Sequence, residues 1–130
     1  MFEMKEEYKT GIAQIDAEHT KLFEIGERAF QLIKNSYSPD KYDDIVSIVY
    51  ELREYAQIHF KNEEEYMKSI NYKKLFTQVI DHQEFMNKVN SIDFNKLDHN
   101  QDEYLMNLLE FVAKWLTDHI IEKDLLIAEN

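Results

Sequence analysis

Residues 45–67 read IVSIVYELREYAQIHFKNEEEYM, and this run indicates the class of fold more clearly than any other part of the chain. Its apolar residues recur every three to four positions, which is the period of one face of an α-helix: Ile45, Val49, Leu52 and Ala56. The same face then carries His59 and Glu63, whose side chains lie one above the other at this spacing. Polar groups on a buried face cost stability unless they are satisfied. The run therefore predicts a long helix whose inward face carries candidate ligands near its C-terminal end.

The composition agrees with long helices. The chain has 130 residues, enough to bury a core in one domain, and only two glycines and one proline. A formal net charge of −11 argues against nucleic acid or an anionic membrane as a partner, because phosphate contacts need clustered lysine and arginine. Without cysteine, any bound metal must take nitrogen and oxygen ligands. The charged N-terminus and the lack of a long apolar run predict a cytoplasmic protein.

Periodicity predicts an irregular arm at residues 1–15 followed by four long helices, at about 17–35, 39–68, 72–90 and 101–127. Asp16 fits the N-cap position of the first helix, and Ser38 followed by Pro39 fits the start of the second. Short links between helices require neighbours to run antiparallel. The expected fold is all-α: an up-down-up-down antiparallel four-helix bundle in a single domain covering residues 1–130.

In such a bundle the beginnings of the first and third helices lie beside the ends of the second and fourth. The polar residues that fall on apolar helix faces then come to one end of the core: His19, His59, Glu63, Gln78, His82 and His119. Together with Asp124 they make four histidines, two carboxylates and a carboxamide, too many for one tetrahedral zinc ion. The donor types suit zinc, copper, iron or manganese. Two metal ions bridged by Glu63 and Asp124 would use all of these residues.

Asp124 raises a geometric difficulty. It follows His119 by five residues and so points well off the same face of a straight α-helix. If both residues bind metal, the helix must contain a wide, π-type turn between them, an irregularity that often marks a functional site.

Three further polar residues are expected to lie outside the site. His99 precedes His119 by twenty residues, which is roughly 30 Å along a helix, so it is expected at the far end and exposed. Glu64 and Glu65 continue an acidic run and are expected to face water.

The chain resembles the hemerythrins, specifically the single-domain bacterial kind, over essentially its full length. Four stretches carry the resemblance: Gly11–His19 (GIAQIDAEH), His59–Glu64 (HFKNEE), His82–Phe85 (HQEF) and Trp115–Asp124 (WLTDHIIEKD). Such a set at these separations is highly specific. The resemblance implies a non-haem di-iron centre, two iron ions joined by an oxo or hydroxo bridge, and reversible O2 binding.

The resemblance also implies a role for each matching residue. His19 and His59 would bind the iron that takes O2, and His82 and His119 would bind the other iron. Glu63 and Asp124 would bridge the two ions. The apolar O2 pocket would be lined by Phe60, Trp115, Leu116 and Ile120.

Two positions depart from the family pattern. The third helix of the family carries a His-x-x-x-His pair, and here Gln78 replaces the first histidine. One iron would then have two imidazole ligands, with either a weaker amide oxygen from Gln78 or an open position that redox chemistry requires. Met4 stands where such proteins usually have tryptophan, a packing substitution.

Three functions remain open at this point. The first is a di-iron protein that binds O2 or a related small oxidant, for sensing, scavenging, storage or delivery, with a possible redox partner protein. The second is a di-iron oxidase or peroxidase that reduces peroxide, O2 or nitric oxide at the position left by Gln78. The third is a helical interaction module that holds zinc or no metal.

Overall fold

The structure is a computed structural model that describes residues 1–35 and 40–129. Four long helices account for most of it: α1 (Ala13–Asn35), α2 (Tyr42–Ser69), α3 (Leu75–Asn90) and α5 (Gln101–His119). Four short elements complete the order along the chain: the 3-10 turn η1 (Glu6–Tyr8), α4 (Phe94–His99), the π-helical turn η2 (Ile120–Asp124) and α6 (Leu125–Ile127). The expected all-α fold is therefore confirmed.

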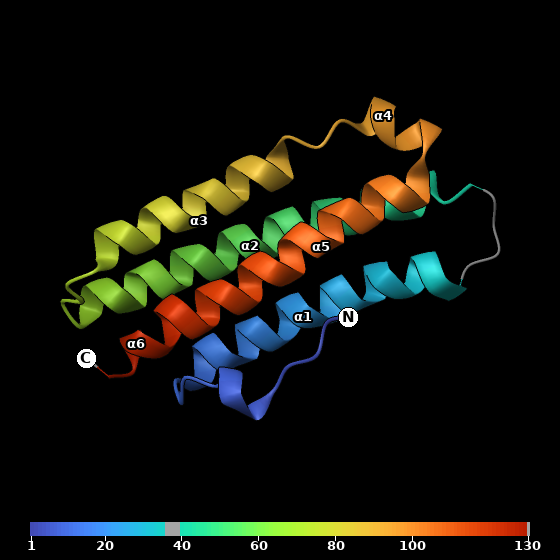
Figure 1. Cartoon of the computed structure of the whole chain (residues 1–130). Coiled ribbons are helices and arrows are strands. Elements are labelled where there is room, and N and C mark those ends of the chain that lie inside the picture. The colour runs from blue at the N-terminus through green and yellow to red at the C-terminus, as the bar shows by residue number, and fades with distance from the viewer. Residues whose placement is uncertain (36–39, 130) are drawn as a thin grey trace.

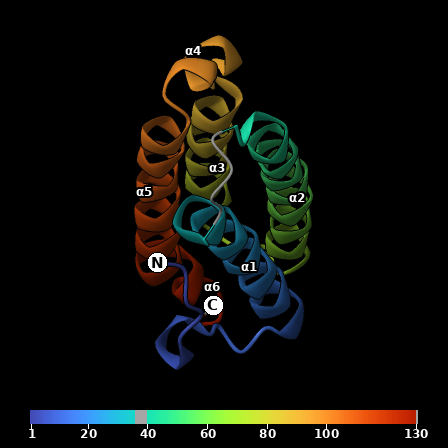
Figure 2. The same cartoon turned by 90° about the vertical axis from the view of Figure 1, so that its right-hand side faces the viewer.

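The long helices pack against one another with alternating direction (Figure 1). α1 packs against α2 and α5, and α2 also packs against α3. The end of α2 and the end of α5 gather at the left of Figure 1, beside the beginnings of α1 and α3. Figure 2 shows the four helices around a common core, with the N-terminal arm below α1. This arrangement brings four distant parts of the chain to one end of the bundle.

The core runs along the length of the bundle and consists of side chains with almost no exposure to solvent. Each long helix contributes residues at the three-to-four spacing of its inward face. Among the most buried are Leu22, Ile25, Ile45, Val49, Ala56, Phe85, Val89, Leu105, Leu109 and Val112. Removing this apolar surface from water is the main favourable term that holds the helices together.

The N-terminal arm packs on α1 at Gly26. A Cβ atom at Gly26 would lie 2.6 Å from the ring of Phe2, so only glycine leaves room for that ring. The terminal ammonium of Met1 and the backbone N–H of Phe2 both contact Glu27 Oε1, at 3.2 and 3.0 Å. Tyr8 stacks on Phe23 with ring centroids 5.9 Å apart. The arm is thereby tied to α1 at both of its ends.

The first helix begins earlier than expected, at Ala13 instead of about residue 17, and Asp16 is not its N-cap. Asp16 lies in the first turn, where its carboxylate accepts hydrogen bonds from the backbone N–H and hydroxyl of Thr10 and from the backbone N–H of Gly11. These bonds hold the arm against the start of α1. The irregular arm therefore ends before residue 13, because Asp16 caps the preceding loop.

Other boundaries differ by a few residues. α2 begins at Tyr42 and α3 at Leu75, later than the expected 39 and 72, while the predicted cap at Ser38 and Pro39 lies outside the described residues. The α2–α3 link is longer because α3 begins later, and α2 ends at Ser69 just before Asn71, which takes a positive φ of 55°. The polar connection at 91–100 contains the short helix α4, whose N-cap Asp93 accepts a hydrogen bond from the backbone N–H of Asn95.

Within residues 1–35 and 40–129, no helix is both long and apolar enough to cross a membrane.

Candidate metal centre

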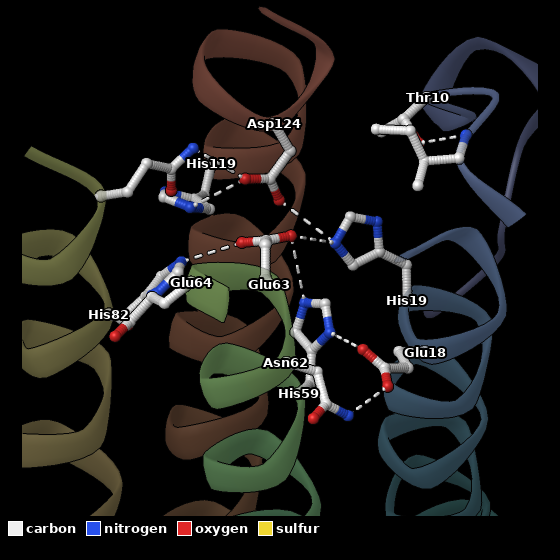
Figure 3. Close-up of polar contacts among 12 residues, drawn as sticks. Thr10, Glu18, His19, His59, Asn62, Glu63, Glu64, His82, His119 and Asp124 are labelled. Atoms are coloured by element: carbon white, nitrogen blue, oxygen red, sulfur yellow. Dashed lines mark hydrogen bonds and ion pairs between the residues drawn. The ribbon is translucent and has the colours of Figure 1, made fainter. Parts of the chain in front are cut away.

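All seven residues expected at the site are buried at the end of the bundle where α6 lies. α1 supplies His19, α2 supplies His59 and Glu63, and α3 supplies Gln78 and His82. His119 ends α5, and Asp124 ends the π-helical turn. In Figure 3 the Glu63 carboxylate occupies the middle, with His82 and His19 on opposite sides and Asp124 above. The structure thus brings together every residue of the predicted ligand set.

Two groups of residues offer ligand atoms close enough to hold a metal ion each. The first is His19, His59 and Glu63, and the second is Glu63, His82, His119 and Asp124. Within each group the ligand atoms all lie within 4.8 Å of one another. Glu63 belongs to both groups, as a bridging carboxylate must.

The two carboxylates divide their oxygens between the groups. Glu63 Oε2 lies 3.5 Å from Nε2 of both His19 and His59, while Glu63 Oε1 lies 3.0 Å from Nε2 of His82. Asp124 Oδ2 lies 3.1 Å from Nε2 of His19, and its Oδ1 lies 3.2 Å from Nε2 of His119. Each carboxylate therefore offers one oxygen to each side.

The donor atoms fit cations better than they fit one another. In the described part of the chain, several buried atoms of the site make no hydrogen bond, although some of them lie within ion-pair distance of one another: Glu63 Oε1 and Oε2, Gln78 Oε1, His19 Nδ1, His82 Nε2 and His119 Nε2. A buried polar atom without a partner costs about 1–3 kcal/mol. Imidazole nitrogens and carboxylate oxygens that converge in this way are ligands that iron, zinc, copper or manganese would satisfy. The residues present therefore fit metal ions.

Carboxylates also contact the outer ring nitrogens of three of these histidines. His59 Nδ1 lies 2.7 Å from Glu18 Oε1, and Asn62 holds the other oxygen of Glu18 at 2.7 Å. His82 Nδ1 lies 2.7 Å from Glu64 Oε2. An acceptor on Nδ1 fixes the tautomer whose Nε2 can bind metal and makes that nitrogen more basic.

The third such pair is looser, with 3.7 Å between His119 Nδ1 and Asp81 Oδ2. None of these acidic partners was predicted from the sequence, and the expectation that Glu64 faces water was wrong: only 24% of its side chain is exposed. The signal available in the sequence was a glutamate beside a ligand, since Glu18 precedes His19 and Glu64 follows Glu63.

Charge balance in this cluster shifts the pKa values of its members. Burial lowers the pKa of His19, but contacts with the Asp124 and Glu63 carboxylates raise it by more, to about 9. Burial likewise lowers the pKa of His82, and Glu63 and Glu64 raise it to about 9. Burial raises the pKa of Asp124, yet His119 and His19 hold it below its usual range. Protons on imidazoles thus balance the carboxylates where a metal ion would otherwise do so.

Gln78 differs from the other six residues in how it meets the cluster. Its amide Nε2 donates a hydrogen bond of 3.1 Å to Asp124 Oδ1, whereas its Oε1 is buried without a partner among the described residues. Only 1% of the residue is exposed. Gln78 therefore acts here as a hydrogen-bond donor to Asp124, one of the expected ligands.

The predicted wide turn between His119 and Asp124 is confirmed. Residues Ile120–Asp124 form a π-helical turn at the end of α5, and Asp124 is buried beside His119. The extra residue in the turn rotates Asp124 back onto the inward face. His99, in contrast, is exposed on α4 at the opposite end of the bundle.

Of the four residues expected around an O2 pocket, Phe60 and Trp115 stack on imidazoles of the cluster. Phe60 stacks on His82 with centroids 4.0 Å apart, and Trp115 stacks on His119 at 4.4 Å. Phe60, Leu116 and Ile120 are buried, while Trp115 is partly exposed in the wall of a groove of about 540 Å³. Apolar side chains therefore cover the cluster on its core side.

Fold and site together define a helical bundle with a buried cluster of histidines and carboxylates that could hold metal. Residues 10–129 match the family described as the hemerythrin HHE cation binding domain. The chain is also 48% identical over 124 residues to bacteriohemerythrin of Clostridium acetobutylicum, across 95% of this chain and 96% of that relative. The chain belongs to the hemerythrin family, whose members bind non-haem iron and O2.

Proposed function

We propose that this chain holds two iron ions and binds O2 or a related small oxidant. The first ion would be held by His19, His59, Glu63 and Asp124. The second would be held by His82 and His119 together with the same two carboxylates. These assignments rest on the family and on the two groups of ligand atoms that share Glu63.

The observation that carries this proposal is the division of the carboxylate oxygens. A carboxylate that serves a single ion offers it one oxygen, or both oxygens on one side. Glu63 and Asp124 instead use both oxygens on opposite sides: each turns one toward His19 and the other toward the opposite pair of imidazoles. Two bridging carboxylates are the donor pattern of a site with two metal ions.

When bound, the iron pair would supply the electrons that capture of O2 needs. The chain itself contributes three things. Glu18 orients the imidazole of His59, and Glu64 orients that of His82. Phe60, Leu116 and Ile120 exclude water from the core side of the site. An apolar surrounding of this kind keeps water away from the metal ions and so limits side reactions of the reduced iron.

The proposal is tested by reducing the iron-loaded protein without O2, exposing it to O2 and recording its visible spectrum. We expect a new absorption band that disappears when O2 is removed and returns on a second exposure. His59→Ala should abolish the band, because it removes an imidazole from the first group. His99→Ala is the matched control, since that histidine is exposed at the other end of the bundle. An unchanged band in His59→Ala would contradict the assignment.

A second candidate function is a di-iron oxidase or peroxidase, and Gln78 favours it. The amide donates to Asp124 instead of offering an imidazole nitrogen, so the second group has one histidine fewer than the family pattern. If this position admits oxidant, Gln78→His should lower turnover of peroxide or O2 with a chemical reductant and lengthen the life of the oxygenated spectrum. Equal turnover and equal spectra in the wild type and Gln78→His would contradict the oxidase or peroxidase function.

A further inference from the structure

A narrow cavity lies on the outer side of Gln78. It has a volume of about 60 Å³ and is lined by residues from the α2–α3 link, the start of α3, the π-helical turn and α6: Tyr72, Lys74, Thr77, Gln78, Glu122, Lys123 and Leu126. A water molecule takes about 30 Å³ in the liquid, so the space suits two waters or one ligand of two or three heavy atoms. Gln78 is thus the residue that belongs both to this cavity and to the metal centre.

The charge of the lining favours an anion. Among the lining residues, Lys74 and Lys123 contribute two positive charges against the single carboxylate of Glu122. Lys123 also pairs at 3.7 Å with Asp81, which lies outside this lining. Tyr72 and Thr77 also line the space, and each carries a hydroxyl that can donate a hydrogen bond. In a chain with a formal net charge of −11, a cavity with an excess of lysine stands out locally.

The wider groove between α3 and α5 has the opposite character. It reaches His119 and Trp115 and is also lined by Lys114 and Lys123, but it carries four carboxylates: Asp81, Glu84, Asp118 and Glu122. A surface with this excess of negative charge repels small anions. Charge therefore selects the narrow cavity over the wide groove as an anion route.

Gln78 closes the inner end of the narrow cavity with a group that can change partners. Its Nε2 donates to Asp124 Oδ1 at 3.1 Å, and its buried Oε1 makes no hydrogen bond in residues 1–35 and 40–129. An amide held by one hydrogen bond can rotate or donate to an incoming anion. A histidine at this position would instead fill the space with an imidazole aimed at the centre.

We propose that the cavity beside Gln78 is a binding site for a small anion of two or three heavy atoms, separate from the apolar O2 pocket. The anion would lie between Lys123 and Gln78, next to the group formed by His82, His119, Glu63 and Asp124. This inference rests on the proposed function, because the site is useful only beside a metal centre. It makes Gln78 the residue that determines which half of the centre is open to anions.

The test uses the iron-loaded, oxidised full chain and azide as the probe. Iron content and the visible spectrum are recorded before azide is added, so that failure to hold two irons is seen separately and removes the proposed function and this site together. Azide is then titrated into the wild type and into Gln78→His, Lys123→Gln and Lys114→Gln. Lys114 is the matched control, since it also pairs with an aspartate on the surface but lines only the wide groove.

We expect the wild type to show two azide-binding phases, one at the iron that takes O2 and one at the cavity, and Gln78→His to lose only the second. Lys123→Gln should weaken this phase about threefold at low salt and less at high salt, because one nearby charge is removed. Lys114→Gln should leave it unchanged. The same number of azide-binding phases in Gln78→His and in the wild type overturns the site. If Lys123→Gln binds azide as tightly as the wild type, the anion does not enter through the narrow cavity. The same conclusion follows if Lys114→Gln weakens azide binding as much as Lys123→Gln does. Lys123→Gln keeps the test decisive if Gln78→His does not fold.

Discussion

Glu18 shows how a single residue prepares a ligand that comes from another helix. One oxygen of its carboxylate lies 2.7 Å from His59 Nδ1, and the second oxygen accepts a hydrogen bond from the side-chain amide of Asn62. Burial raises the pKa of Glu18, but its hydrogen bonds with His59 and Asn62 lower it by more, so the carboxyl stays charged. The charged partner fixes the tautomer that leaves Nε2 free for metal.

Glu18→Ala should therefore weaken iron binding by about 10–100-fold. Affinity would be measured by competition with a chelator. Glu24→Ala is the control, because Glu24 is an exposed residue of the same helix whose carboxylate contacts Lys21. Glu18→Gln keeps an acceptor oxygen and should fall between the two. If Glu18→Ala binds iron as tightly as Glu24→Ala, Glu18 does not position the ligand.

Metal binding should release protons from the metal-free protein. His19 and His82 have pKa values raised to about 9, so both are protonated at pH 7.5, and both must be neutral to bind metal. Loading at pH 7.5 should release about two protons per chain, and fewer as the pH approaches 10. Calorimetric titrations in buffers with different ionisation enthalpies measure this number. Release of no protons at pH 7.5 would show that these histidines are neutral before binding.

The raised pKa values of His19 and His82 also predict how the stability of the metal-free protein changes with pH. A histidine whose pKa is raised from about 6.5 to about 9 contributes stability that is complete below pH 6.5 and is lost as the pH rises through 9. The metal-free protein should therefore unfold at lower denaturant concentration at pH 9 than at pH 6.5. The metal-loaded protein should lack this dependence on His19 and His82, because its ligands no longer titrate in that range.

Residue identity indicated the histidines and carboxylates that the structure brings together, but not the acidic residues behind them. A histidine on an apolar face stands out in a sequence, whereas Glu64 is one of three consecutive glutamates and carries no mark of its own. Each step along an α-helix turns the side chain by about 100°, so Glu64 leans toward α3 while Glu65 is exposed. The difference between Glu64 and Glu65 depends on the position of α3, and the run of glutamates gives no information about that position.

At the scale of elements, the arm and α1 fit together through the missing side chain of Gly26. Gly26→Ala should destabilise the protein by about 1–3 kcal/mol, because the new methyl group would meet the ring of Phe2. In a Phe2→Ala background the same change should stabilise by up to about 1 kcal/mol, since alanine is the better helix former. Chemical denaturation of the four proteins measures both effects. The same sign in both backgrounds would show that Phe2 is not the cause.

Helix ends show what spacing can and cannot predict. The π-helical turn was predictable because Asp124 follows His119 by five positions, and a straight α-helix cannot place both on one face. The start of α1 was not, because an aspartate fits an N-cap and a loop-capping position equally well. The Asp16 carboxylate accepts hydrogen bonds from Thr10 and Gly11, which precede the helix. These bonds depend on the path of the N-terminal arm, which the sequence around Asp16 does not reveal.

At the scale of the whole molecule, alternating helix directions account for the site. Ligands near the beginnings of α1 and α3 and near the ends of α2 and α5 can meet only if neighbours are antiparallel, as Figure 1 shows. This part was predictable, since it follows from apolar periodicity and short links alone. The way Glu63 and Asp124 share their oxygens was not, because it depends on side-chain positions within an ångström.

The most direct test of the account is the metal content of the protein after anaerobic loading with ferrous iron and removal of excess metal. Elemental analysis should find about two irons per chain, because two ligand groups share Glu63 and Asp124 turns its second oxygen toward His19 of the first group. Glu63→Ala should lose both ions, since it removes a ligand common to the two groups. One iron per chain, zinc in place of iron, or no metal would contradict a centre with two irons.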